Sequence, residues 1–513
     1  MIALESLPDE VRQYILAQQA TVAQLTQLLK LKEEEIKLLN FRLFGAKSEK
    51  LSQAQMDLLF AEPGLTAEEV HKEADLPDAK KADPLPQAKQ PRRRNPGRDK
   101  LPAHLERRVV TIPCHPKDCQ CARCGAERPV IGYETHEELG MEPAKFFIKE
   151  VRREQRGSHC QPEQGVVTAP APARITPKGK LSDEFIIEVL ARKYQQHLPV
   201  YRQCANLAED YGLDLSRATL TQAVLAAGEL LRAVVRAQAE EIKRGSYLQG
   251  DETTVPVQQA EKTGKNHTAY LWQYSVPGGP VIFDFQMGRG RVGPAAFLQG
   301  FRGVLQCDGY EAYDKLGEGI EYAGCMSHAR RGFVDAAKLA PLDPLPADVL
   351  GRFNKLYEVE RESRAAQDTV AQRLARRQQQ SVPLMTALRE RLVTIRQNIM
   401  PGTKLAKACD YALGQWSRLE VYLQNGLVEI DNNWCEGGMR PLALGRKNWL
   451  HLGSEETGPK VAAIASIIET CRRLDINLRE YLTEVLPKLG AWPITRVGEL
   501  TPTAWKAAKA KKN

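Results

Sequence analysis

The sequence predicts a multidomain α/β protein, and three observations lead to this fold class. The chain has 513 residues, which is too many for a single hydrophobic core. Strand-like patterns gather from residue 246 onwards, with helical patterns before and after them. The composition is ordinary for a globular protein, with 42% hydrophobic and 27% charged residues. We therefore expect several structural units in succession.

The bulk composition excludes some classes of protein. No apolar run approaches the ~20 residues that span a bilayer, and the N-terminus lacks the pattern of a signal peptide. The 11 cysteines are typical of reduced thiols, so we expect a cytoplasmic protein without a membrane partner. The net charge of +8 is modest, but Lys and Arg cluster in 89–100 and near the C-terminus. Such clusters suit a polyanion, and solvated surface is the alternative.

The first segment, 1–61, contains a predicted helix over residues 8–44. Apolar residues recur there every seven positions: Ile15, Val22, Leu29, Ile36 and Leu43. β-Branched residues at one seam position and Leu at the other favour a two-stranded coiled coil. We expect this helix to support self-association, and packing against its own chain is the alternative.

Residues 62–100 predict a basic, disordered linker. They are rich in Pro, Ala, Lys and Asp and contain almost no large apolar residue. The basic end of the segment includes Arg92, Arg93 and Arg94, which we expect to contact DNA. A plain tether explains the same composition.

Residues 101–175 predict a zinc-finger-like module between short strands. Cys121 and Cys124 have the spacing of a zinc knuckle, and a glycine follows them. Cys160 is a candidate third ligand, but Glu163 stands where another cysteine is expected. Four further residues could complete a set of four ligands: His159, Cys119, Cys114 and His115. The pattern favours Zn²⁺ binding, and a knuckle without a metal is the alternative.

Residues 176–243 predict a helical region like a helix-turn-helix. A helix is followed by a short Gly-Leu-Asp-Leu turn at 212–215 and by a second helix that Ser216 caps. The second helix could enter a major groove, with Arg217 facing DNA. Many ordinary helical hairpins share this spacing, so packing is an equal interpretation.

From residue 246 the pattern changes to strands. Three strands, a short helix and a fourth strand follow one another within 244–338. This is the order of the ribonuclease-H-like fold, in which the first and fourth strands lie side by side. Asp251 lies within the first strand and Asp308 at the end of the fourth, so we expect their carboxylates to converge.

Two converging carboxylates repel one another unless cations lie between them. Carboxylate oxygens suit Mg²⁺ or Mn²⁺, which also bind phosphate oxygens. Two such ions ~4 Å apart can activate a water or a 3′-hydroxyl and stabilise the leaving oxygen. A third carboxylate closes such a site, and Glu429, Asp431 and Glu436 compete for this role. Aspartates at strand ends are also common without any metal.

Several motifs resemble those of transposases of the insertion sequence sixty-six family. They are FGAKSEKL at 44–51, KYQQHLPVYR at 193–202, DET at 251–253, CDGY at 307–310, GCMSHARR at 324–331 and DNNWCEGGMRPLALGRKNW at 431–449. The motifs run in order over nearly the whole chain, and several are long. The resemblance is therefore specific.

The resemblance implies a DNA transposase of the aspartate–aspartate–glutamate type, in which Glu436 completes the Mg²⁺ site of Asp251 and Asp308. Its ribonuclease-H-like core would be interrupted by a helical insertion, for which 339–415 is suitably polar and helix-rich. The second part of the core would then be 416–490, followed by a basic tail, 491–513. Such an enzyme acts on element ends and target DNA in the bacterial cytoplasm, as a homodimer or higher synaptic assembly, with possible accessory proteins.

The resemblance also implies supporting residues. Cys325 and His328 recur in related transposases, where they would support the active site by packing or by ligating a metal. Arg440, Arg446 and Lys447 suit the phosphate backbone, because a guanidinium forks onto phosphate oxygens. Ordinary surface charge is the alternative for these three.

Two departures from the family pattern bear on activity. Gly437 and Gly438 follow the glutamate, where the family has an arginine, and each glycine weakens a helix by up to ~1 kcal/mol. We therefore expect a frayed turn at Glu436. Glu163 replaces a zinc cysteine. These departures keep two alternatives open, namely a catalytically decayed or repurposed DNA-binding protein and a nuclease that cuts without joining.

Overall fold

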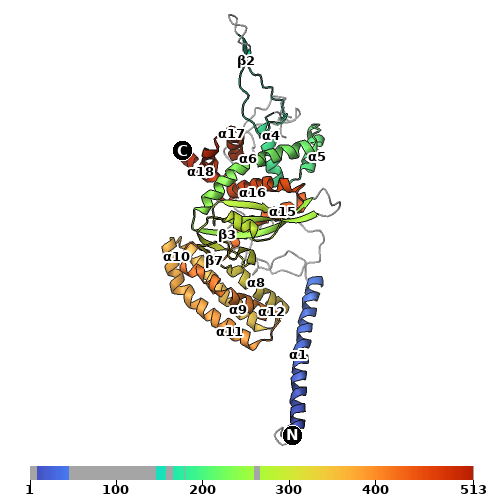
Figure 1. Cartoon of the computed structure of the whole chain (residues 1–513), viewed down its shortest axis with the longest axis vertical. Coiled ribbons are helices and arrows are strands. Elements are labelled where there is room, and N and C mark those ends of the chain that lie inside the picture. Colours follow the sequence, from blue (N-terminus) through green and yellow to red (C-terminus); the bar gives the residue numbers. More distant parts are fainter. Residues whose placement is uncertain (1–8, 45–145, 158–165, 178, 259–265, 512–513) are drawn as a thin grey trace, which may run out of the picture. The chain divides into compact units, whose positions relative to one another are not determined.

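The computed structural model describes residues 9–44, 146–157, 166–177, 179–258 and 266–511 (Figure 1). Several predictions fall on residues outside these ranges. They concern the linker arginines Arg92, Arg93 and Arg94, and the possible zinc ligands Cys121, Cys124 and Cys160. The roles of these residues in binding DNA and zinc stay predictions.

Within the described residues, the N-terminal part is one helix, as the heptad pattern predicted. Helix α1 (Asp9–Phe44) is continuous over 36 residues. Val22, Leu29 and Ile36 of the predicted seam are exposed to solvent. A second copy of the helix could cover them, and the coiled coil stays a prediction.

The chain divides into two compact units by its contacts. In the smaller one, the short strands β1 (Gln155–Gly157) and β2 (Val166–Thr168) pair antiparallel. The larger one contains everything from Pro170 to the C-terminus, including all the described residues that we predicted for the catalytic site.

A five-stranded sheet is the centre of the larger unit. Its strands are β3 (Tyr247–Gln258), β4 (Asn266–Ser275), β5 (Val281–Gln286), β6 (Gly303–Gln306) and β7 (Ile320–Ala323), in the spatial order β5-β4-β3-β6-β7. The first three strands are antiparallel, whereas β6 runs parallel to β3 and β7 parallel to β6. The predicted pairing of the first and fourth strands is confirmed.

The two faces of this sheet pack against different helices because successive strand residues point to opposite sides. Leu248 and Leu305 belong to one hydrophobic core, and their neighbours Tyr247 and Val304 belong to the other. The first core includes residues of α4 (Asp183–Tyr194), α6 (Arg217–Lys243), α16 (Gly458–Arg473) and α17 (Leu478–Leu489). The second includes residues of α8 (Met326–Leu339) and of the helices that follow it (Figure 1).

The predicted helical region before the sheet has the expected hairpin. Helix α5 (Val200–Tyr211) ends at Gly212, whose φ of 64° is left-handed, and α6 begins after Ser216. The Ser216 side chain accepts a hydrogen bond from the Thr219 amide, so the predicted cap is confirmed.

Among the described residues, α6 is the one helix long and apolar enough to cross a membrane by length and composition. The same composition is typical of a core helix. Leu220, Leu231 and Val234 are fully buried, and α6 packs along α16. The packing therefore accounts for its apolar character.

Between Asp308 and Glu436 the chain forms mostly helices. They are α8, α9 (Pro344–Ala365), α10 (Val370–Arg376), a π-helical turn η5 (Arg377–Ser381), α11 (Val382–Asn398), α12 (Lys404–Gly414), α13 (Trp416–Leu419) and α14 (Val421–Gln424). Phe353, Leu388 and Cys409 are fully buried at their centre. The helix-rich composition of 339–415 therefore predicted the local structure correctly.

A buried ion pair lies within these helices. Arg377 and Glu360 have side chains that are 0% exposed, and two of their N–O distances are 2.7 and 2.8 Å. Arg377 Nη1 also donates to the carbonyl of Val428, over 2.8 Å. The pair thus fastens the helices to the segment that leads toward Glu436.

The remaining elements complete the larger unit. They are α7 (Val292–Phe297), η4 (Glu311–Tyr313), α15 (Asn433–Trp449), η6 (Glu455–Thr457), η7 (Ile494–Leu500) and α18 (Pro502–Ala510). The predicted basic tail is folded as far as Lys511, and Trp505 packs edge-on against Tyr481 with ring centroids 5.6 Å apart. Of the basic residues in this segment, Arg496 lies in η7, and Lys506 and Lys509 lie in α18.

Candidate active site

Asp251 lies in the middle of β3, at the centre of the sheet. Its Oδ1 accepts a hydrogen bond from the Glu252 amide, over 2.8 Å. Burial and, to a smaller extent, the charges of Glu252, Glu436 and Asp308 raise the pKa of Asp251 to about 8. Asp251 therefore lies within range of the charges of the other two carboxylates predicted for the metal site.

Asp308 lies two residues beyond β6, in a tight turn rather than at the strand's last position. Its Oδ1 accepts from the Tyr310 amide over 2.9 Å, and Gly309 has the positive φ of 88° that the turn requires. Tyr411 of α12 donates its hydroxyl hydrogen to the Asp308 carbonyl, over 2.5 Å. A helix residue 103 positions further along the chain thus also holds the turn.

Glu436 lies in the first turn of α15, and the helix continues through both glycines that follow. The expectation of a frayed turn is wrong because tertiary contacts hold this part of the helix. A Cβ atom on Gly438 would lie 2.7 Å from Arg473 Nη2, so close packing needs the glycine there. A Cβ atom on Gly437 would meet nothing within 4 Å.

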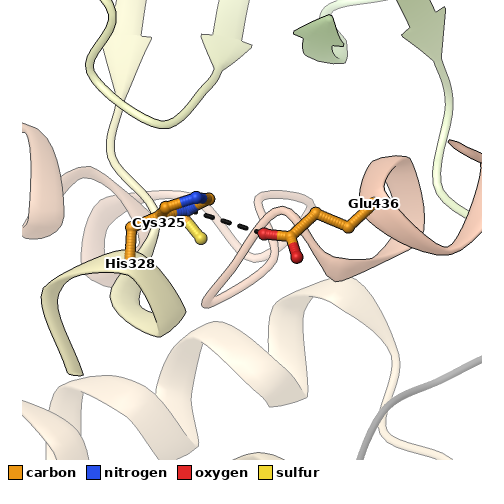
Figure 2. Close-up of side chains that lie close together, drawn as sticks. All are labelled: Cys325, His328 and Glu436. Carbon is orange, nitrogen blue, oxygen red and sulfur yellow. Dashed lines mark ion pairs between the residues drawn. The ribbon is translucent and has the colours of Figure 1, made fainter. Parts of the chain in front are cut away.

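The start of α8 faces Glu436 (Figure 2). His328 Nδ1 lies 3.5 Å from Glu436 Oε1, and Arg331 Nη2 lies 3.4 Å from Glu436 Oε2. Cys325, at the N-cap of α8, joins this group, since one ligand atom of each of Cys325, His328 and Glu436 lies within 4.8 Å of the others. The predicted supporting residues therefore contact the third carboxylate.

Glu429 and Asp431, the two other candidates for the third carboxylate of the metal site, have different partners. Glu429 pairs with Arg364 and Arg373 at 2.9 and 2.7 Å. Asp431 is buried and accepts from the backbone amide and side-chain amide of Asn433 at 3.2 and 3.0 Å. Burial raises the pKa of Asp431 to about 7. Both residues shape the segment before α15.

Glu252 is a fourth acid in the site that sequence reasoning did not single out. Its side chain is 3% exposed, and Arg289 Nη2 lies 2.6 Å from its Oε1. Arg289 also stacks over the ring of Tyr310 at 3.9 Å, beside Asp308. In the sequence, Glu252 is the second of two adjacent acids within one predicted strand. Only the first of them, Asp251, was predicted as a metal ligand.

Two buried glutamines tie the strands to the glutamate helix, and sequence reasoning missed them. Gln249 donates to the Asp431 carbonyl over 2.9 Å and accepts from the Cys435 amide over 3.2 Å. Gln306 donates to the Glu429 carbonyl over 2.8 Å. Both side chains belong to residues that are 0% exposed. In the sequence, each of these glutamines is recognisable as a polar residue two positions before an aspartate of the predicted metal site.

The predicted DNA-binding residues do not form one cluster with the carboxylates. Arg446 donates to the carbonyl and hydroxyl of Thr254, and burial lowers the pKa of its guanidinium. It therefore ties α15 to β3. Arg440 and Lys447 are exposed on α15, and Arg217 is exposed at the first position of α6.

The residues present fit a hard divalent cation. Asp251, Glu252, Asp308 and Glu436 offer carboxylate oxygens, the ligand type that Mg²⁺ and Mn²⁺ prefer. Burial is the main cause of the raised pKa of Asp251, and the neighbouring acids Glu252, Glu436 and Asp308 add negative charge that a cation would offset. Oε1 of Glu436 is buried without a hydrogen-bond donor, so it is available as a ligand.

Comparison with known proteins agrees with these observations. Residues 178–460 match the family described as Transposase IS66 family, and residues 32–110 match Transposase C of IS166 homeodomain. Similar curated proteins include three uncharacterized proteins of Sinorhizobium fredii (strain NBRC 101917 / NGR234). Protein y4hP is 30% identical, covering 82% of this chain and 78% of its own length. Protein y4qI is 31% identical with 98% and 95% covered, and y4jD is 31% identical with 95% and 96% covered. The first match spans more than half of the chain and includes Asp251, Asp308 and Glu436, so the chain belongs to the IS66 family of transposases.

Proposed function

We propose that this chain is a metal-dependent DNA transposase that cleaves element ends and joins their 3′-hydroxyls to target DNA. The observation that carries the proposal is that Asp251 lies close enough to Asp308 and Glu436, which come from distant parts of the chain, for their charges to raise its pKa. Asp251 comes from β3, Asp308 from the turn after β6, and Glu436 from α15, and their charges act together on the pKa of Asp251.

The strand order supports a ribonuclease-H-like core. Three antiparallel strands are followed by a fourth that is parallel to the first, and the two aspartates lie on or just after these paired strands. The helices between Asp308 and Glu436 then form the insertion, and α15 with α16 completes the core.

Asp251, Asp308 and Glu436 would hold Mg²⁺ or Mn²⁺. When bound, such ions activate a water or a 3′-hydroxyl and stabilise the leaving oxygen of a phosphodiester. The chain's own groups orient the ligands. The Tyr310 amide holds the Asp308 carboxylate, and Arg331 holds Oε2 of Glu436. Asp251 must give up its proton to bind an ion.

DNA is the proposed partner, both as element ends and as target. Exposed Arg217, Arg440 and Lys447 offer positive charge to phosphates. The exposed apolar seam of α1 suits a homodimer or a higher synaptic assembly. Accessory proteins, Zn²⁺ at Cys121, Cys124 and Cys160, and a cytoplasmic location stay predictions from the sequence.

The rival proposal is a decayed protein that binds DNA without cutting it. Two departures from the family pattern favour it, namely Gly437 in place of the arginine after Glu436 and Glu163 in place of a zinc cysteine. The continuous helix and the intact carboxylates favour the enzyme.

The deciding experiment uses purified full-length chain and labelled DNA that carries the element's own ends, with Mg²⁺ or Mn²⁺. Wild type is compared with Glu436→Gln and with a control, Glu358→Gln, which makes the same change on the exposed face of α9. We expect metal-dependent cleavage and joining in wild type and control, and neither in Glu436→Gln.

Each other outcome identifies an alternative. Cleavage without joined product in the wild type indicates a nuclease, and binding without cleavage indicates a DNA-binding protein. Full activity of Glu436→Gln shows that another residue supplies the third carboxylate.

A further inference from the structure

We propose that Cys325, His328 and Glu436 form a binding site for Zn²⁺ that shares Glu436 with the proposed Mg²⁺ site. The existence of this site does not depend on catalysis. Its effect on activity, which is competition for Glu436, rests on the proposed function.

The local fold brings the three side chains together. Cys325 is the N-cap residue of α8, and His328 lies three positions later in the first turn. Residues three apart are neighbours at a helix surface, so the thiol and the imidazole lie on one side. Glu436 reaches them from the first turn of α15, as Figure 2 shows. One ligand atom from each residue lies within 4.8 Å of the other two.

Two polar atoms of this group are buried without a hydrogen-bond partner. They are Nδ1 of His328 and Oε1 of Glu436, which lie 3.5 Å apart. Leaving a buried polar atom unpaired costs about 1–3 kcal/mol. An ion bound by both atoms would remove this cost. The other oxygen of Glu436 has its own partner in Arg331, so Oε1 is the free ligand.

The sulfur atom has the surroundings of a metal ligand. Cys325 is 2% exposed, and its Sγ accepts a hydrogen bond from the Asn432 amide over 3.2 Å. A backbone donor of this kind orients a ligating sulfur. Burial raises the pKa of the Cys325 thiol, so the thiolate would form only as the ion displaces the proton. Asn432 is also the N-cap of α15, so the same contact links Cys325 to the helix of Glu436.

The ligand atoms of this site favour Zn²⁺ over Mg²⁺. One sulfur, one nitrogen and one oxygen are ligands that Zn²⁺ accepts in a tetrahedral site, whereas Mg²⁺ prefers oxygen alone. Three protein ligands leave a fourth position for water. Binding would release the Cys325 proton to solvent, which leaves a thiolate and a carboxylate to balance the two charges of the ion.

Zinc content tests the site independently of activity. The full-length protein is depleted of metal and dialysed against Zn²⁺, and bound zinc is counted in wild type, Cys325→Ser and His328→Gln. The control is Cys204→Ser, which changes a half-buried cysteine on α5. We expect the two site variants to lose one equivalent of zinc and the control to lose none. Cys121→Ser separates any zinc held by the predicted knuckle.

Cobalt substitution gives a second readout, because a thiolate ligand adds a sulfur-to-cobalt absorption band. In a background with Cys121→Ser and Cys124→Ser, which removes both thiolates of the predicted knuckle, we expect a band that Cys325→Ser abolishes and that Asp251→Asn keeps. Asp251→Asn removes a proposed catalytic ligand, so it distinguishes loss of this site from loss of the transposase chemistry. Zinc content and a cobalt spectrum that are the same in wild type, Cys325→Ser and His328→Gln would overturn the proposal. Circular dichroism spectra identical to wild type show that each variant is folded.

Discussion

The side-chain amide of Gln249 donates a hydrogen bond to Oε1 of Gln306 over 2.8 Å, between the parallel strands β3 and β6. Each glutamine lies two positions before an aspartate of the candidate site. Because Gln249 also bonds the Asp431 carbonyl and the Cys435 amide, one side chain links both strands to the start of α15. A neutral side chain therefore connects the two strands and the helix that carry the three carboxylates.

The first prediction concerns this glutamine. Gln249→Leu leaves buried acceptors unpaired, and we expect a single-turnover cleavage rate at least ~10-fold lower, about 1.4 kcal/mol of barrier. The Kd for DNA should stay unchanged. The control is Gln378→Leu, which removes one bond to the Leu423 carbonyl within the insertion. Equal loss of rate in both variants would mean that Gln249 acts only through general stability.

The second prediction concerns pH. The pKa of Asp251 is raised to about 8, so the folded, metal-free protein binds this proton more tightly than the unfolded chain does. Stability should therefore fall as pH rises from about 4, the unfolded pKa, to about 8. Asp251→Asn removes this loss. In a chelator, we expect its Tm to match wild type near pH 4 and to exceed it by at least ~2 °C at pH 8.

Thermal unfolding of both proteins across this pH range checks the prediction. A difference in Tm that does not grow with pH would show that Asp251 titrates normally in the folded chain.

The third prediction separates two adjacent glycines. The Cβ atom added by Gly437→Ala would meet nothing within 4 Å. This substitution should therefore stabilise the protein by about 0.5–1 kcal/mol, because alanine favours a helix more than glycine does. Gly438→Ala places a Cβ 2.7 Å from Arg473 Nη2 and should destabilise it by about 1–3 kcal/mol. Urea unfolding of the two variants gives both values. Changes of the same sign would contradict the close packing at Gly438.

The fourth prediction concerns the buried ion pair. Arg377→Met leaves Glu360 with its ion pair to Arg373 and removes the donor to three backbone carbonyls, so we expect the free energy of unfolding to fall by about 3–5 kcal/mol. Arg376→Met is the matched control at the next position. Arg376 pairs with Asp368 while its own side chain is 26% exposed, so we expect its loss to cost much less stability than the loss of Arg377. Similar urea midpoints for the two variants would argue against a structural role for Arg377.

Local patterns predicted the parts of the fold that depend on neighbouring residues. The cap at Ser216 and the pairing of the strands of Asp251 and Asp308 follow from turn chemistry and from strand order. Pattern alone did not choose among Glu429, Asp431 and Glu436, because that choice depends on contacts between distant segments. The resemblance to a family selected Glu436.

Other features could not be predicted because tertiary contacts override local preference. The helix around Gly438 persists because Arg473 and Gln273 pack against it. A glutamine in a strand, such as Gln306, usually indicates a solvent-facing position, yet here it is fully buried and hydrogen-bonded. Arg446 likewise looks like surface charge until its bonds to Thr254 are seen.

The order of the ligands along the chain has a consequence for protein synthesis. Asp251 and Asp308 lie before the helical insertion and Glu436 lies after it. A chain on the ribosome that has formed β3 and β6 still lacks its third carboxylate. It gains this carboxylate only when the whole insertion and the start of α15 have left the ribosome. Under the proposed chemistry, products of premature termination within the insertion could occupy DNA but could never cut it.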